Sequence, residues 1–297
     1  MPANPKLPDL TTILTLMKYK VSLAVTFTTV TGYLIYSGSF DLRLLYTAIG
    51  VFILAGGTSA LNQVQERNFD ARMERTKHRP LPSHKITPKS ALIISLVLML
   101  TGLTILYFLS GKVSAALGLF NIFWYNIIYT YLKRITPFAV VPGSLVGAIP
   151  AIIGWSAAGG AIFDTRIIVI AYFLFIWQIP HFWFLLLKYG KEYEVAGFPS
   201  ITKVFTLQGL KSLTFIWIIA TSITTLMFPL FNIITIPLLL IIIFILNIWL
   251  VITFTRITFN LKISINFKRA FATINVFMLV ILLLLTLEAI INKALRL

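Results

Sequence analysis

Nine apolar runs divide this chain, and each approaches the about 20 residues that a helix needs to cross a bilayer. They cover residues 21–37, 44–61, 90–109, 113–132, 138–158, 167–187, 212–228, 233–255 and 270–291. Hydrophobic residues make up 58% of the sequence and charged residues 11%, which excludes an ordinary soluble domain. The sequence therefore predicts an all-α, polytopic membrane protein with nine transmembrane helices in a single membrane domain, residues 1–297.

The net charge of +16 follows the predicted spans. With the N-terminus in the cytoplasm, five basic residues lie outside: Arg43, Lys112, Arg166, Lys293 and Arg296. The other twenty lie inside: Lys6, Lys18, Lys20, Arg67, Arg72, Arg75, Lys77, Arg79, Lys85, Lys89, Lys133, Arg134, Lys188, Lys191, Lys203, Lys211, Arg256, Lys262, Lys268 and Arg269. This asymmetry predicts an inner-membrane protein with a cytoplasmic N-terminus, cytoplasmic basic loops and an external C-terminus. It also explains the basic excess without a nucleic-acid partner.

A polar stretch over residues 61–86 separates the second and third runs. Asn62, Glu66, Asp70 and Glu74 recur every four residues, so on a helix they share one face. Oxygen ligands in a row suit Mg²⁺, and the basic residues that follow suit the phosphates that Mg²⁺ bridges. The alternative is a solvated helix face with i,i+4 pairing, which is the simpler role for Glu74. We expect a cytoplasmic loop over residues 62–89 and diphosphate chemistry beside it.

The sixth run contains a second polar cluster. Gln178 and His181 lie one turn apart in an apolar helix, either as a functional pair or as helix–helix hydrogen bonds. Acidic and basic residues, Glu192 among them, follow in a second predicted cytoplasmic loop, residues 188–207. Spans two and six leave the membrane on the same face, so Glu192 could complete a two-sided diphosphate cage with the first acidic row. At the start of the first run, Lys18 and Lys20 are either interfacial anchors or include one cation that faces a phosphate.

Four segments carry a resemblance to the UbiA superfamily of intramembrane prenyltransferases: LNQVQERNFDARMERTKHRPLP, YTYLKRITPF, VGAIPAIIGW and WQIPHFWFLLLKYGKEYEVAGFP. RTKHRPLP together with WQIPHF is most similar to the heme O synthases, the protoheme IX farnesyltransferases. The resemblance implies nine helices around a central cavity that opens to the cytoplasm and to lipid. It also implies Mg²⁺-dependent transfer of the farnesyl group of farnesyl diphosphate to a vinyl group of heme B, with water addition giving the hydroxyethylfarnesyl group of heme O.

Site roles carry over by position. The resemblance implies metal and catalytic roles for Asn62, Glu66, Asp70 and Glu192, diphosphate contacts from Lys20, Arg75, Arg79, Lys133, Arg134 and Lys188, and heme contacts from Trp177, Gln178 and His181. Glu66 and Glu192 stand where Asp is usual, which lengthens each side chain by one methylene. His84 stands where Gly is usual, and Ala139 where Asn is usual.

Two alternative functions fit parts of the sequence. A UbiA-type enzyme could prenylate a quinone precursor or another aromatic or tetrapyrrole acceptor. A membrane transporter also places polar residues and prolines inside spans, although the acidic row at the cytoplasmic boundary argues against it. The resemblance further implies membrane lipid as the surroundings and an association with heme A synthase or with oxidase assembly. The sequence predicts no oligomeric state.

Overall fold

The computed structural model describes residues 8–259 and 267–295, and within these ranges the chain is helical without strands. The α-helices are α1 (Leu10–Leu16), α2 (Tyr19–Ser37), α3 (Leu42–Asp70), α4 (Pro88–Ile105), α5 (Lys112–Phe123), α6 (Thr130–Leu132), α7 (Val140–Gly143), α8 (Leu145–Ala157), α9 (Thr165–Ala196), α10 (Leu207–Leu226), α11 (Pro237–Phe259) and α12 (Phe267–Leu295). Short π-helical segments, η1 (Leu106–Ser110) and η2 (Trp124–Tyr129), continue α4 and α5.

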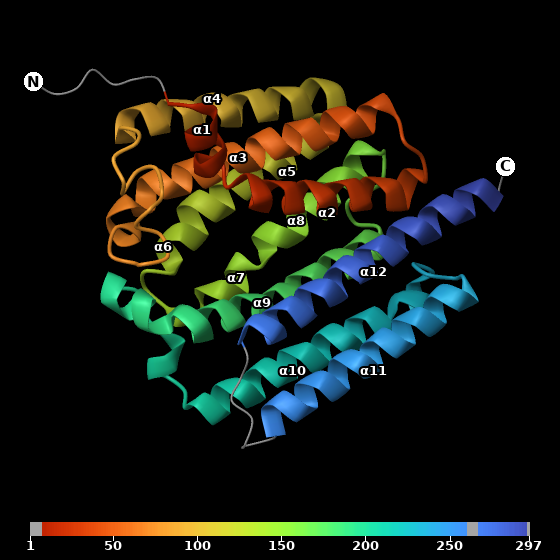
Figure 1. The fold of residues 1–297 in the computed structure, drawn as a ribbon. Coiled ribbons are helices and arrows are strands. Elements are labelled where there is room, and N and C mark those ends of the chain that lie inside the picture. Colours follow the sequence, from red (N-terminus) through yellow and green to blue (C-terminus); the bar gives the residue numbers. More distant parts are fainter. Residues whose placement is uncertain (1–7, 260–266, 296–297) are drawn as a thin grey trace, which may run out of the picture.

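The predicted membrane architecture is confirmed. Within the described ranges, eight helices are long and apolar enough to span a membrane, and a ninth span is present if the bent pair α1–α2 counts as one. The helices run side by side, with α10, α11 and α12 on one flank of the bundle (Figure 1). The predicted basic residues Lys6, Lys262 and Arg296, and both chain termini, lie outside the described residues.

The first span begins with a bend that the sequence pattern did not predict. Asp9 accepts a hydrogen bond from the Thr12 backbone N–H and starts α1, which precedes the first predicted apolar run. The axes of α1 and α2 differ by 58°. Lys18 lies at the break in a left-handed conformation with φ 47°, which is costly for a residue with a Cβ. This bend fixes where the Lys18 side chain points.

Two helices extend beyond their apolar runs. The predicted cytoplasmic loops begin inside α3 and α9, because α3 continues to Asp70 and α9 continues to Ala196. Both helices end on the same side of the bundle, where the chain after α3 lies next to the end of α9 (Figure 1). Asn62, Glu66 and Asp70 therefore lie on rigid helix instead of on a loop, whereas Glu74, the fourth residue of the predicted row, lies in the turns after α3 and does not share that helix face.

Helices α2 and α8 meet backbone to backbone. A Cβ atom on Gly32 would overlap the backbone carbonyl of Ala151, and one on Gly154 would overlap the backbone carbonyl of Thr29. Only glycine allows an approach this close. The fifth span is broken after α7, and Pro150 lies inside α8, where it removes one main-chain hydrogen bond.

Acidic residues cap or join helices at the other end of the bundle. Asp41 and Asp164 cap α3 and α9. Glu288 is 3% exposed and accepts hydrogen bonds from the backbone of Thr235 and Ile236 just before α11. These acids have structural partners at the end opposite the acidic row.

Candidate active site

A cavity of about 350 Å³ lies between α2, α3, α5, α8 and α9. Its wall is polar at the end of α3, where Asn62, Glu66 and Asp70 face it, and becomes apolar deeper in the bundle, where Val25, Leu54 and Ile153 line it. A charged head and an apolar tail of one ligand could therefore lie in the same cavity.

Each member of the acidic row has a cationic partner. Lys18 Nζ donates to Asn62 Oδ1 at 3.0 Å, Lys133 Nζ pairs with the Glu66 carboxylate, and Arg79 Nη1 lies 2.8 Å from both Asp70 oxygens. The cations come from the α1–α2 bend, from the end of α6 and from the chain after α3. All six residues line the cavity, so the predicted face of α3 presents three oxygen groups and three cations to one space.

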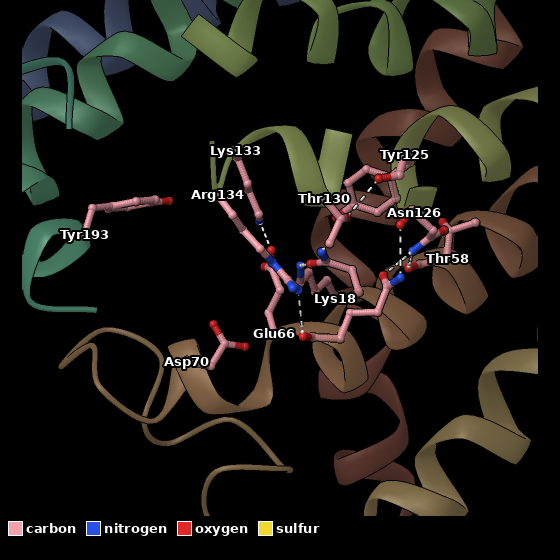
Figure 2. A network of polar contacts seen from close by, with 12 residues as sticks. Lys18, Thr58, Glu66, Asp70, Tyr125, Asn126, Thr130, Lys133, Arg134 and Tyr193 are labelled. Carbon is pink, nitrogen blue, oxygen red and sulfur yellow. Dashed lines mark hydrogen bonds and ion pairs between the residues drawn. The ribbon is translucent and has the colours of Figure 1, made fainter. Parts of the chain in front are cut away.

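Hydrogen bonds behind the row fix its position. Asn62 Nδ2 donates to Thr130 Oγ1 at 3.1 Å, and the neighbouring Gln63 donates to the carbonyls of Thr15 and Leu16 at the end of α1. Asn126, buried in η2, donates to the Thr58 carbonyl at 3.1 Å. Figure 2 shows the positions of Lys18, Thr130, Asn126 and Thr58 in this network. The end of the fourth span, η2 and α6, thus orients the site.

Three predicted diphosphate contacts lie away from the cavity wall. Arg134 donates to the Gln65 carbonyl at 2.9 Å and lies over the rings of Phe69 and Tyr131, so it braces α3. Lys20 is exposed beside Tyr19, and Lys188 is exposed over the ring of Tyr189. The structure does not bring these three cations to the described cavity wall. The cation of the first span that faces the cavity is Lys18. The predicted contacts Arg75, Arg79 and Lys133 also line the cavity.

Glu192 is turned toward the chain that follows α3. Its Oε2 accepts a hydrogen bond from the Arg75 backbone N–H at 3.0 Å, and Glu192 is absent from the described cavity lining. Nearby, the rings of Phe69 and Phe198 stack with centroids 4.6 Å apart. The ends of α3 and α9 do meet, and in this structure Glu192 joins them through its hydrogen bond to the Arg75 amide.

The predicted heme contacts separate onto two faces of α9. Gln178 lines the cavity and packs against Gly147. Trp177 is 6% exposed and donates its Nε1 hydrogen to the Ile274 carbonyl of α12 at 2.7 Å. His181 packs between the rings of Trp177 and Phe271, also toward α12. Of the three residues, the structure brings only Gln178 to the cavity.

Sequence reasoning missed three tyrosines. Tyr125 and Tyr129 line the cavity from η2, and Tyr193 lines it from the end of α9. In Figure 2 the Tyr193 ring points toward Lys133. Tyr125 and Tyr129 lie in the predicted fourth span, but a π-helical turn that rotates their side chains toward the cavity is not visible in a sequence.

The donor set fits Mg²⁺. In the described part of the chain, no three His, Cys, Asp or Glu side chains come together in a way that could hold a metal ion. Mg²⁺ is usually held by one or two carboxylates together with substrate phosphates and water, and seldom by an all-protein cage. Glu66, Asp70 and the Asn62 amide offer that partial set, with cations beside them for the phosphates.

The comparisons with known proteins agree with this architecture. The UbiA prenyltransferase family profile matches residues 25–277. A protein of Geobacter sulfurreducens named protoheme IX farnesyltransferase is 37% identical over 219 residues, 74% of this chain and 81% of that protein. One of Neorickettsia sennetsu with the same name is 39% identical over 191 residues, 63% of each chain.

A solved structure shares the fold. A UbiA homolog from Archaeoglobus fulgidus bound to GPP and Mg²⁺ superposes with a TM-score of 0.69 at 12% identity, covering 94% of this chain and 99% of that one. The profile spans most of the chain, the Geobacter relative aligns over most of its length, and the bundle is the same. This multi-pass membrane enzyme therefore belongs to the UbiA prenyltransferase family.

Proposed function

We propose that this enzyme transfers the farnesyl group of farnesyl diphosphate to a vinyl group of heme B, with water addition giving the hydroxyethylfarnesyl group of heme O. The relatives' shared name supports this acceptor and donor. The observation that carries the proposal is the row of three oxygen groups and three cations at the mouth of an apolar cavity. Such a site fits a prenyl diphosphate, and membership of an enzyme family sets aside the transporter alternative.

The polar end of the cavity would hold the diphosphate. Lys18, Arg79 and Lys133 supply cations to its oxygens, and Arg75 adds a fourth. Asn62, Glu66 and Asp70 would hold Mg²⁺, which when bound neutralises the charge that develops on the leaving diphosphate. Because Asp70 is 1% exposed, these charges act where water screens them little.

The apolar part would hold the prenyl chain and the reacting carbon. Loss of diphosphate leaves positive charge on the allylic carbon, and the electron-rich vinyl carbon attacks it. The Tyr125, Tyr129 and Phe182 rings line this region and can stabilise a cation through their faces. Gln178 is the polar group available to orient the acceptor. The apolar wall keeps water away from the carbocation until the carbon–carbon bond forms.

The distribution of basic residues supports the orientation. The cavity mouth lies at the end of α3, among Arg72, Arg75, Lys77 and Arg79, on the side that carries most of the positive charge. We therefore assign the active-site end to the cytoplasmic face of a bacterial inner membrane. Association with heme A synthase or with oxidase assembly stays a prediction.

The decisive experiment incubates the purified, bilayer-reconstituted enzyme with heme B, farnesyl diphosphate and Mg²⁺ and identifies the product by mass spectrometry. We expect a heme O mass, and its loss in Asp70→Ala or with a metal chelator. Glu74→Ala is the matched control, because Glu74 pairs with Lys77 on the surface and is 71% exposed. Diphosphate release with a quinone precursor but none with heme B would replace the proposed acceptor with the aromatic one.

A further inference from the structure

The cavity ends on a floor formed by three different helices. Val51 of α3, Gly118 of α5 and Ile153 of α8 are the lining residues farthest along their helices from the polar end. All three are buried, and Val51 and Ile153 belong to one apolar cluster with Leu54 and Leu106. The cavity lining therefore ends at these residues, and buried side chains of one apolar cluster lie behind it.

Leu106 closes the floor from behind. It is 0% exposed, and its side chain lies against both Gly50 of α3 and Gly118 of α5: Cβ atoms built on these glycines would lie 3.1 and 3.2 Å from its methyl carbons. A Cβ on Gly118 would also lie 2.9 Å from Leu54 Cδ2, which is on the cavity wall. Glycine at position 118 thus lets the cavity reach this depth, and Leu106 stops it there.

The distance from the acidic row to the floor follows from the rise of α3, which carries residues of both. Asn62 is the row member nearest the floor, and a diphosphate held by the row would leave its first carbon at about this level. Leu54 lies eight residues before Asn62 and Val51 eleven residues before it, which is about 12 and 17 Å along the helix.

A farnesyl chain matches that distance. Polypeptide extends by about 3.3–3.6 Å for every three bonds, and a carbon chain extends similarly. The main chain of a farnesyl group, counted from the diphosphate oxygen, then spans about 14 Å, against about 9 Å for geranyl and about 19 Å for geranylgeranyl. Only the farnesyl length reaches the wall at Leu54 without passing the floor at Val51.

We propose that the floor of Val51, Gly118 and Ile153, closed from behind by Leu106, limits the prenyl chain that this cavity accepts to three isoprene units. The proposal rests on the proposed function for its donor class, because it places a prenyl diphosphate in this cavity. It assigns the length limit to four residues that take no part in the polar chemistry.

The test measures binding, so it does not depend on the acceptor. The full-length enzyme in nanodiscs with Mg²⁺ is titrated with unreactive thiolo analogues of geranyl, farnesyl and geranylgeranyl diphosphate, which compete with labelled farnesyl diphosphate. For the native chain we expect geranylgeranyl to bind at least tenfold more weakly than farnesyl. Leu106→Ala should reduce the ratio of farnesyl to geranylgeranyl affinity at least fivefold. Gly118→Ala should weaken binding of the farnesyl analogue relative to the geranyl analogue.

Leu34→Ala is the matched control. Leu34 is 1% exposed and packs in a separate cluster with Tyr33 and Leu44, so it loses the same atoms from a buried site that does not line the cavity. In Leu34→Ala the affinities for the geranyl, farnesyl and geranylgeranyl analogues should keep the ratios of the native chain. The ratio of two affinities measured in one preparation does not depend on the fraction of enzyme that is folded. If Leu106→Ala folds poorly, Val51→Phe is a second test variant, and it should weaken binding of the farnesyl analogue while leaving binding of the geranyl analogue unchanged.

The outcomes separate the two proposals. Equal affinities for the three lengths in the native chain, or variants that change all three alike, would overturn the length limit. A native chain with the expected length preference that does not alkylate heme B would keep the limit and overturn the proposed acceptor. A chain that binds none of the three analogues would overturn both.

Discussion

Glu192 Oε2 accepts a hydrogen bond from the backbone N–H of Arg75 at 3.0 Å, and this contact ties the end of α9 to the chain that carries Arg79. A carboxylate that holds a backbone amide has a different role from one that holds a metal. The two roles predict different effects of replacing the Glu192 carboxylate with the side-chain amide of glutamine.

We expect Glu192→Gln to retain most of the activity, because the glutamine oxygen can still accept from the Arg75 amide. Glu192→Ala should lose about tenfold, since a freed segment would misplace Arg75 and Arg79. The activity of each variant is measured as a steady-state rate over a range of Mg²⁺ concentrations. Glu194→Ala is the control, because Glu194 bonds to Thr202 in an exposed pair. A loss in Glu192→Gln as large as in Glu192→Ala, with weaker Mg²⁺ dependence, would restore the metal role.

Lys18 lies at the bend between α1 and α2 with φ 47°, so its backbone suits glycine. Lys18→Gly should therefore keep the bend while removing the ammonium group that bonds to Asn62. We expect diphosphate affinity to fall tenfold or more, with no decrease in thermal stability. Lys20→Ala is the comparison, because Lys20 is exposed beside Tyr19, and its affinity should be unchanged. Equal losses in the two variants would show that Lys18 is only a surface anchor.

Asp70 accepts from Arg79 through both oxygens and is 1% exposed. Asp70→Asn removes the charge from a site where it is poorly screened, so we expect the rate of diphosphate release to fall by at least a hundredfold. The assay is release of labelled diphosphate at saturating Mg²⁺. A rate within threefold of the native value would mean that Asp70 serves only to hold Arg79.

Arg134 was expected at the diphosphate and instead donates to the Gln65 carbonyl between two aromatic rings. Arg134→Ala should lower the unfolding free energy by about 2 kcal/mol through loss of a charged hydrogen bond and its ring contacts. Thermal unfolding in detergent measures this, and diphosphate affinity in the folded fraction should change less than threefold. A large loss of affinity at native stability would return Arg134 to the site.

The order of the helices was predictable because bilayer length is a strong constraint on apolar runs. The face of α3 was predictable as well, since a four-residue step has a fixed meaning on a helix. The roles of Lys18 and Lys20 were not, because a left-handed residue at a bend reverses which lysine faces inward. Likewise Gln178 and His181 are one turn apart in sequence, yet only Gln178 lies on the cavity side of α9.

The glycine contacts between α2 and α8 bear on how a wide acceptor could enter. Helices that touch through their backbones at Gly32 and Gly154 have no side chains there that can rearrange. Helix α9, on another side of the cavity, contains Pro180, which removes one main-chain hydrogen bond from the helix. We therefore expect α9 to move when a broad, flat substrate enters the cavity, while α2 and α8 keep a fixed spacing.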